Sequence, residues 1–107
     1  WCDLKKIELN WAELKNELPN WVYKLKNLKF LIVKNSQITK ISNNINNLNE
    51  LITLDLSNNY LTWAFFDLNF KKLEFLNLSW NKLNLKKNNF ENLPKLEYFN
   101  ISWNTLE

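Results

Sequence analysis

A motif of apolar residues recurs five times along the chain. Its clearest copy, residues 51–61, has the order L-x-x-L-x-L-x-x-N-x-L. Each copy begins with a leucine, and consecutive copies begin 22 to 24 residues apart, at Leu4, Leu28, Leu51, Leu73 and Leu96. A sequence that repeats itself at this period predicts a stack of similar units, each packed against its neighbours.

The alternation of apolar and polar residues within each copy predicts a short strand. In the third copy, Leu54 and Leu56 fall on one face of the strand, whereas Thr53 and Asp55 fall on the other. A second apolar set lies in the segments that return to the next copy. Because one unit cannot bury both sets alone, we expect parallel strands stacked over a continuous core. The return set comprises Leu18, Val22, Leu25, Ile41, Ile45, Leu48, Leu85, Phe90 and Leu93.

These repeats resemble the leucine-rich repeat family over essentially the whole chain. The resemblance implies a single α/β domain over residues 1–107, a solenoid with a curved parallel β-sheet on the concave face and irregular or short helical convex segments. The coils are expected at about residues 4–27, 28–50, 51–72, 73–95 and 96–107. Several apolar residues of the third coil compete for the same inward positions, so the register of residues 62–72 is left open.

Both ends of the predicted stack lack the polar cap that terminal coils normally need. No polar segment precedes Leu4, and the sequence stops at Glu107, soon after the last predicted strand. We therefore expect the chain to be a fragment of a longer solenoid, and the isolated chain to associate through its open edges.

One polar position recurs inside the motif and has a predicted structural function. A chain that leaves a strand carries backbone groups that no ladder satisfies, and buried ones must be paired. An asparagine amide both donates and accepts, so it can bond to its own turn and to the next coil. Ser36 could do this only in part, and Ala12 not at all. The asparagine column is Asn59, Asn81 and Asn104.

The positions that alternate with the inward leucines form the candidate partner-binding surface. In a parallel stack they line up across the concave face, and they include aromatic residues, which are enriched at binding hot spots. Two other interpretations stay open: strand propensity alone favours these aromatics, or a register shift of one residue turns the rings inward. The candidate residues are Phe30, Ile32, Thr53, Asp55, Phe75, Asn77, Tyr98 and Asn100.

The family resemblance implies a protein–protein interaction module. Two alternatives from other classes remain. The repeats could be the targeting arm of a larger enzyme or effector, or they could belong to a surface adhesin that contacts glycans through its aromatic residues.

Composition narrows the chemistry. The chain has no histidine and a single cysteine, Cys2, so the commonest general base, an internal disulfide and a thiolate zinc site are all missing. We expect no enzymatic activity and no metal or cofactor. The net charge is only +3 and arginine is absent, so we expect no nucleic-acid partner. The longest apolar runs, such as residues 30–33, are far too short for membrane insertion.

Glycine and tryptophan counts are both unusual, at 0 and 6. Trp11, Trp80 and Trp103 are the second residues after the predicted strands, where a turn can require a positive φ that glycine adopts freely. Trp21 and Trp63 also occupy positions where the resembling family commonly has glycine. Either these tryptophans form exposed contacts, or the gene uses a code in which UGA specifies glycine and the codon has been read as tryptophan.

Overall fold

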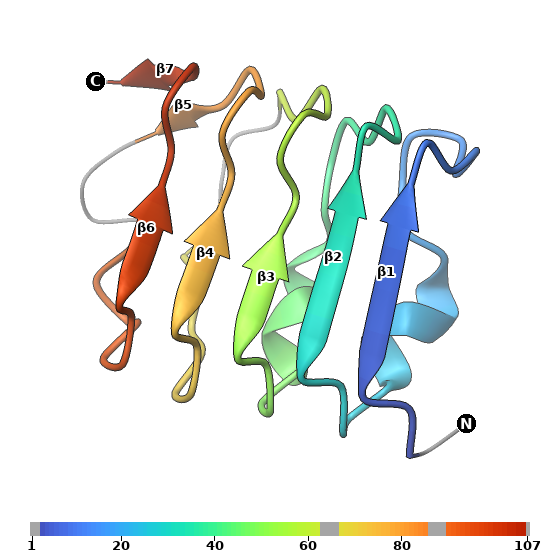
Figure 1. Cartoon of the computed structure of the whole chain (residues 1–107), viewed down its shortest axis with the longest axis vertical. Helices are drawn as coiled ribbons and strands as arrows, with labels where there is room; N and C mark the ends of the chain where they lie inside the picture. The colour runs from blue at the N-terminus through green and yellow to red at the C-terminus, as the bar shows by residue number, and fades with distance from the viewer. Residues whose placement is uncertain (1–2, 63–66, 86–89, 107) are drawn as a thin grey trace.

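The fold is built on one five-stranded sheet in which every strand pair is parallel (Figure 1). The computed structural model describes residues 3–62, 67–85 and 90–106. Each copy of the motif supplies one strand, and the strand order follows the chain, β1-β2-β3-β4-β6. This confirms the predicted parallel sheet. The strands are β1 (Lys6–Asn10), β2 (Phe30–Lys34), β3 (Thr53–Asp55), β4 (Phe75–Asn77) and β6 (Tyr98–Asn100).

Equivalent positions of successive copies lie side by side in the sheet. Leu31 pairs with Leu54, Leu54 with Leu76, and Leu76 with Phe99. Because the repeat sets the register, one apolar position of the motif becomes one continuous row across the sheet.

The core lies between the sheet and the return segments. The motif leucines of the second, third and fourth copies are almost completely buried, as are most residues of the return set. In the return of the third copy, Leu68 and Phe70 are also buried, at 1% and 0% exposure, so both point inward in the stretch whose register the sequence left open. Residues 63–66 of that stretch, and the side chain of Leu85, lie outside the described residues.

The first two return segments each contain a short 3-10 helix on the side of the molecule away from the viewer in Figure 1. These are η1 (Asn20–Lys24) and η2 (Asn43–Asn47). The Ser42 hydroxyl caps η2 by accepting a hydrogen bond from the Asn44 N–H at 3.1 Å. The later returns instead contain β5 (Asn84–Leu85) and β7 (Thr105–Leu106), which pair in parallel. Within the described part of the chain, no helix has the length and hydropathy needed to cross a membrane.

Asn59 joins the second and third coils through a buried amide. Its Nδ2 donates to the carbonyls of Val33 and Leu56, both at 2.9 Å. Its Oδ1 accepts from the Ser36 and Ile38 N–H groups at 2.9 and 3.3 Å. A single side chain thus satisfies backbone groups of two coils that the ladder leaves unpaired.

Asn81 and Asn104 make the same connection one and two coils later. Their Oδ1 atoms accept from the Leu61 and Leu83 N–H groups, both at 3.0 Å. Their amide groups donate to carbonyls of the preceding coil at 3.0 and 2.8 Å. The asparagine column therefore holds each of these coils to the one before it.

The first coil lacks the asparagine connection to the second, although β1 and β2 pair over five residues. Ala12 contributes only its backbone N–H, which donates to Ser36 Oγ at 3.1 Å. Ser36 Oγ in turn donates to the Lys34 carbonyl at 2.8 Å. The Ser36 hydroxyl accepts one hydrogen bond and donates one, so it replaces only part of what an asparagine amide does.

Candidate interaction surface

The side chains that alternate with the buried leucines form what we call the outer face of the sheet. Leu31, Leu54 and Leu76 are at most 1% exposed on the core side, so their strand neighbours project to the opposite side. The interpretation that a register shift turns the rings inward is therefore wrong. All eight candidate residues lie on this face, in a first row of Phe30, Thr53, Phe75 and Tyr98 and a second row of Ile32, Asp55, Asn77 and Asn100.

The aromatic end of the first row is ordered by stacking. The Phe75 and Tyr98 rings lie 4.4 Å apart between centroids with only 5° between their planes. Phe75 is half-buried, whereas Tyr98 is 44% exposed. Phe30 and Ile32 are half-buried nearer the first coil. The outer face thus offers an apolar surface on which the Phe75 and Tyr98 rings already hold each other in place.

The polar residues of the second row close turns within their own chain. Asp55 Oδ1 accepts from the Ser57 N–H at 3.0 Å and from the Ser57 hydroxyl at 2.7 Å. Asn77 and Asn100 bind the serines two residues later in the same way. Asp55 is only 8% exposed, so it presents little surface to a partner. The sequence Asp/Asn-x-Ser, which recurs in these copies, signals such a turn, because an Asp or Asn side chain can accept a hydrogen bond from the residue two positions later.

The β1 end of the outer face is polar. Lys6 and Glu8 form an ion pair at 3.2 Å, with both side chains more than half exposed. Beside it, the Asn35 amide donates to Asn10 Oδ1 at 2.9 Å. The outer face therefore changes from charged and polar at β1 to aromatic at β4 and β6.

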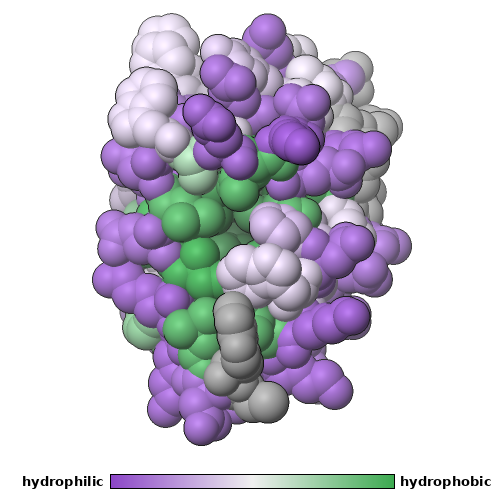
Figure 2. Space-filling model, turned by 90° about the vertical axis from the view of Figure 1, so that its right-hand side faces the viewer, coloured by the Kyte–Doolittle hydropathy of each residue, from purple (hydrophilic) through white to green (hydrophobic). Residues whose placement is uncertain are grey.

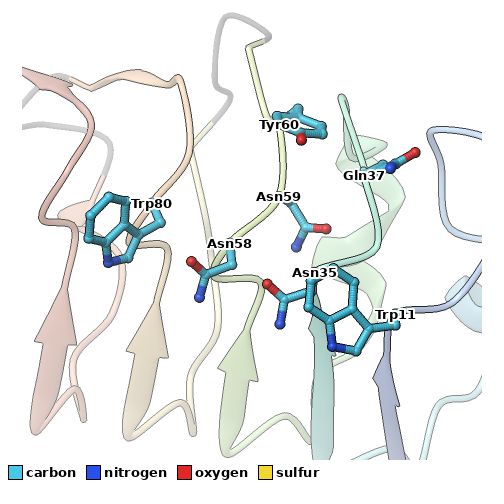
Figure 3. A pocket seen from close by; sticks show the side chains of 7 residues that line it. All are labelled: Trp11, Asn35, Gln37, Asn58, Asn59, Tyr60 and Trp80. Carbon is cyan, nitrogen blue, oxygen red and sulfur yellow. The ribbon is translucent and has the colours of Figure 1, made fainter.

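A second surface lies where the chain leaves the strands. We call the five equivalent residues there the exit row: Trp11, Asn35, Asn58, Trp80 and Trp103. All five have a positive φ, between 53° and 61°. Figure 3 shows Trp11 and Trp80 on either side of a groove that Asn35, Asn58 and Tyr60 also line. The indoles of Trp80 and Trp103 stack at 4.5 Å with an interplanar angle of 14°.

Trp21 and Trp63 do not belong to the exit row. Trp21 lies in η1, and Trp63 lies outside the described residues.

In the described part of the chain, no three histidine, cysteine, aspartate or glutamate side chains lie close enough to hold a metal ion. Burial raises the pKa of Tyr23 above its usual value of 10.0, although the Ser42 N–H that donates to its Oη at 3.2 Å acts in the other direction. This tyrosine joins the first two return segments and faces the core rather than the outer face.

The stack of parallel coils belongs to the class of repeat proteins in which one short motif supplies one strand and one return. The leucine-rich repeat model matches residues 50–69 and 72–94, which correspond to the third and fourth coils. The third and fourth coils are therefore leucine-rich repeats, and such repeats generally mediate protein–protein interaction and typically carry no enzymatic activity. No curated protein matches the chain.

Proposed function

We propose that the chain is a recognition module that binds a protein partner through the outer face of its sheet. The observation that carries this proposal is the stacked pair of Phe75 and Tyr98, exposed on a face whose backbone is held by ladder hydrogen bonds on both sides of β4. The curvature that would make this face concave is part of the proposal.

The pair is suited to binding because it is ordered before a partner arrives. Binding is opposed by the ordering of side chains and loops at the interface. Phe75 and Tyr98 restrict each other by stacking, and neither belongs to a loop. Buried aromatic side chains supply most of the energy in many interfaces, so a partner should seat an apolar side chain against these rings.

The charged end of the same face would set the orientation of the partner. Lys6 and Glu8 are exposed and lie at the rim, where charges influence the rate of association and its salt dependence more than the final affinity. A partner with an apolar centre and a charged group on one side fits this arrangement.

The test first identifies the partner by position and then measures its affinity. A photoreactive residue at position 98 should crosslink a protein that the same residue at Lys24, in η1, does not. With that protein purified, Phe75→Ser/Tyr98→Ser should weaken binding at least tenfold. Tyr60→Ser is the matched control, because Tyr60 is 48% exposed but lies outside the outer face.

The affinity of a variant is informative only if the variant is folded. The unfolding free energy of each variant is therefore measured in urea alongside its binding curve. Since the rings project outward, we expect the double substitution to lower the unfolding free energy by about 1 kcal/mol, mainly from the lost stacking. Equal affinity of the double variant and the wild type would contradict the proposal. So would an equal loss in Tyr60→Ser. Crosslinking to a glycan instead of a protein would favour the adhesin alternative.

A second candidate interaction is association of two copies end to end. Phe99 is 42% exposed at the open edge of β6, whereas Leu76, its partner in the row, is fully buried. Figure 2 shows the opposite end of the stack, where an apolar strip is rimmed by polar residues. Leu4 is 37% exposed there, and Leu9 and Leu14 are only partly buried. Parallel strands at both edges allow head-to-tail pairing, which extends the sheet.

Sedimentation across a hundredfold concentration range tests this association. We expect the mean mass of the 107-residue chain to rise with concentration, and Phe99→Glu to abolish the rise. Tyr60→Glu, which adds the same charge away from both edges, should leave it unchanged. A constant monomer mass at all concentrations would contradict end-to-end association.

A further inference from the structure

The geometry of the exit row is set by the stacking of the coils. Its five residues come from five different copies, yet their φ angles span only 53° to 61°. The backbone N–H groups of Trp11, Asn58 and Trp80 donate to carbonyls of the following coil, at 3.1, 3.0 and 3.0 Å. The left-handed conformation therefore recurs with the repeat, at the point where the chain turns away after bonding to the next coil.

This conformation suits some residue types and not others. Glycine adopts a positive φ freely, and asparagine is several-fold enriched there among the other residues. Asn35 and Asn58 follow this preference. Trp11, Trp80 and Trp103 oppose it, because a bulky side chain in this region brings Cβ close to the following carbonyl oxygen.

Steric opposition alone does not carry the inference. Lys15 and Gln37 also have a positive φ, at 51° and 59°, so the fold tolerates long side chains at such positions. The informative fact is the concentration of one residue type: every exit-row residue that is not asparagine is tryptophan. These three positions hold half of the six tryptophans of the chain.

The indoles contribute little to the packing of the molecule. Trp11, Trp80 and Trp103 are 75%, 51% and 66% exposed, and none belongs to the core. Trp80 and Trp103 stack on each other rather than on buried residues. Removing these side chains leaves the core untouched.

Composition supplies the second, independent observation. A chain of this length typically has roughly seven glycines, about 7% of its residues, but this one has none. The same exchange accounts for part of both anomalies, because glycine is lacking where the backbone favours it and three of the six tryptophans stand at those places.

We infer that the native residue at positions 11, 80 and 103 is glycine, encoded by UGA codons that the source cell decodes as glycine. The structure does not extend the inference to Trp21, which lies in a 3-10 helix, and Trp63 lies outside the described residues. The functional consequence is specific. Trp11 and Trp80, two of the three aromatic side chains that line the groove in Figure 3, are then absent from the native protein, and recognition rests on the outer face, whose residues are unaffected.

Peptide mass spectrometry of the protein purified from its own cells decides the question. We expect the peptides that span residues 11, 80 and 103 to carry glycine at each position, and the gene to have UGA at each codon. Tryptophan in these peptides, or UGG codons in the gene, would overturn the inference and leave the exit row as an aromatic surface. Neither result depends on the outer face, so this inference and the proposed function fail separately.

Urea unfolding of tryptophan variants of the recombinant chain provides a second test of the inference. Trp80→Gly/Trp103→Gly should raise the urea midpoint or leave it unchanged, because relief of the left-handed strain offsets the lost stacking. Trp21→Gly is the control, since glycine weakens a helical segment and should lower the midpoint. A clear fall in the midpoint of the double variant would show that the indoles stabilise the fold, and would contradict the inference.

Discussion

The first two strands of the sheet are longer than the last three. A side-chain hydrogen bond that ends the short strands explains this difference. β1 and β2 have five residues each, whereas β3, β4 and β6 have three. In the short strands the position between the two inward residues is Asp55, Asn77 or Asn100. Each of these side chains holds the N–H of the serine two residues later.

The long strands have no such turn. The equivalent positions in β1 and β2 are Glu8 and Ile32, followed two residues later by Asn10 and Lys34. Ile32 has no acceptor, and the Glu8 side chain is paired with Lys6. The ladder therefore continues to the pairing of Asn10 with Lys34. A side-chain acceptor competes with the neighbouring strand for backbone N–H groups. The residue between the two inward positions therefore determines the length of the strand.

The first coil and the later coils also differ in the side chains that join them to their neighbours. The later coils are held by the amides of Asn59, Asn81 and Asn104, whereas the first is bonded through a serine hydroxyl at the equivalent position. Since opening free energies vary along a structure with such local contacts, we expect the first coil to exchange its amide protons fastest.

The largest expected effect comes from breaking the asparagine column. Asn81→Ala leaves the Leu61 N–H and the carbonyls of Leu56 and Leu78 without this partner. Each buried, unpaired backbone group costs about 1–3 kcal/mol, so we expect a loss of about 3 kcal/mol or more in urea unfolding.

Ala12→Asn is the reciprocal substitution at the equivalent position of the first coil. The structure describes no preceding coil for its amide to join, so we expect a change within about 0.5 kcal/mol. A large gain from Ala12→Asn, or a small loss from Asn81→Ala, would contradict the proposed difference between the two ends.

An intermediate effect is expected at the turn that ends β3. Asp55→Ala removes the acceptor for the Ser57 N–H and hydroxyl, and should lower the unfolding free energy by about 1–2 kcal/mol. Asp55→Asn keeps the acceptor and reproduces the arrangement found at Asn77, so it should be nearly neutral. Equal losses in the two variants, measured by urea unfolding at one pH, would show that the carboxylate charge matters instead of the turn.

The smallest expected effect concerns Tyr23, which joins the first two coils on the return side through the Ser42 N–H. Burial raises its pKa in the folded state above the 10.0 expected when unfolded. The unfolded chain therefore loses this proton first. The stability contributed by Tyr23 is complete below pH 10 and falls as the pH rises through the raised value.

Tyr23→Phe should remove this part of the alkaline loss. We expect the difference in unfolding free energy between the wild type and the variant, roughly 1 kcal/mol near neutral pH, to shrink as the pH rises above 10. Thermal or urea unfolding of both proteins at paired pH values measures this difference, because contributions common to both proteins cancel. A constant difference across that range would contradict the role assigned to Tyr23.

The sequence predicted the parts of the structure that repeat. Leu31, Leu54 and Leu76 were assigned inward because strand alternation and a common register follow from the motif. The positive φ of Trp80 was predictable because this residue lies in the turn that follows the strand. The turn formed by Asp55 was not recognised, although Asp-x-Ser was visible, because a polar residue on an open face was interpreted as available to a partner.

Other features depend on contacts that no single copy contains. The stacking of Phe75 on Tyr98 requires two strands in register and a particular pair of rotamers. The inward placement of Leu68 and Phe70 depends on the volume left by the neighbouring coils. These are properties of packing, which the alternation of residue types along one strand does not determine.

The asparagine column gives the molecule a direction. Each of its amides reaches back to the coil that precedes it in the chain, so a newly synthesised coil remains incomplete until its successor leaves the ribosome. Consolidation then proceeds from the amino terminus in the order of translation. Shortening the chain from its carboxyl end would uncover, with each coil removed, the unpaired backbone of the one that is left.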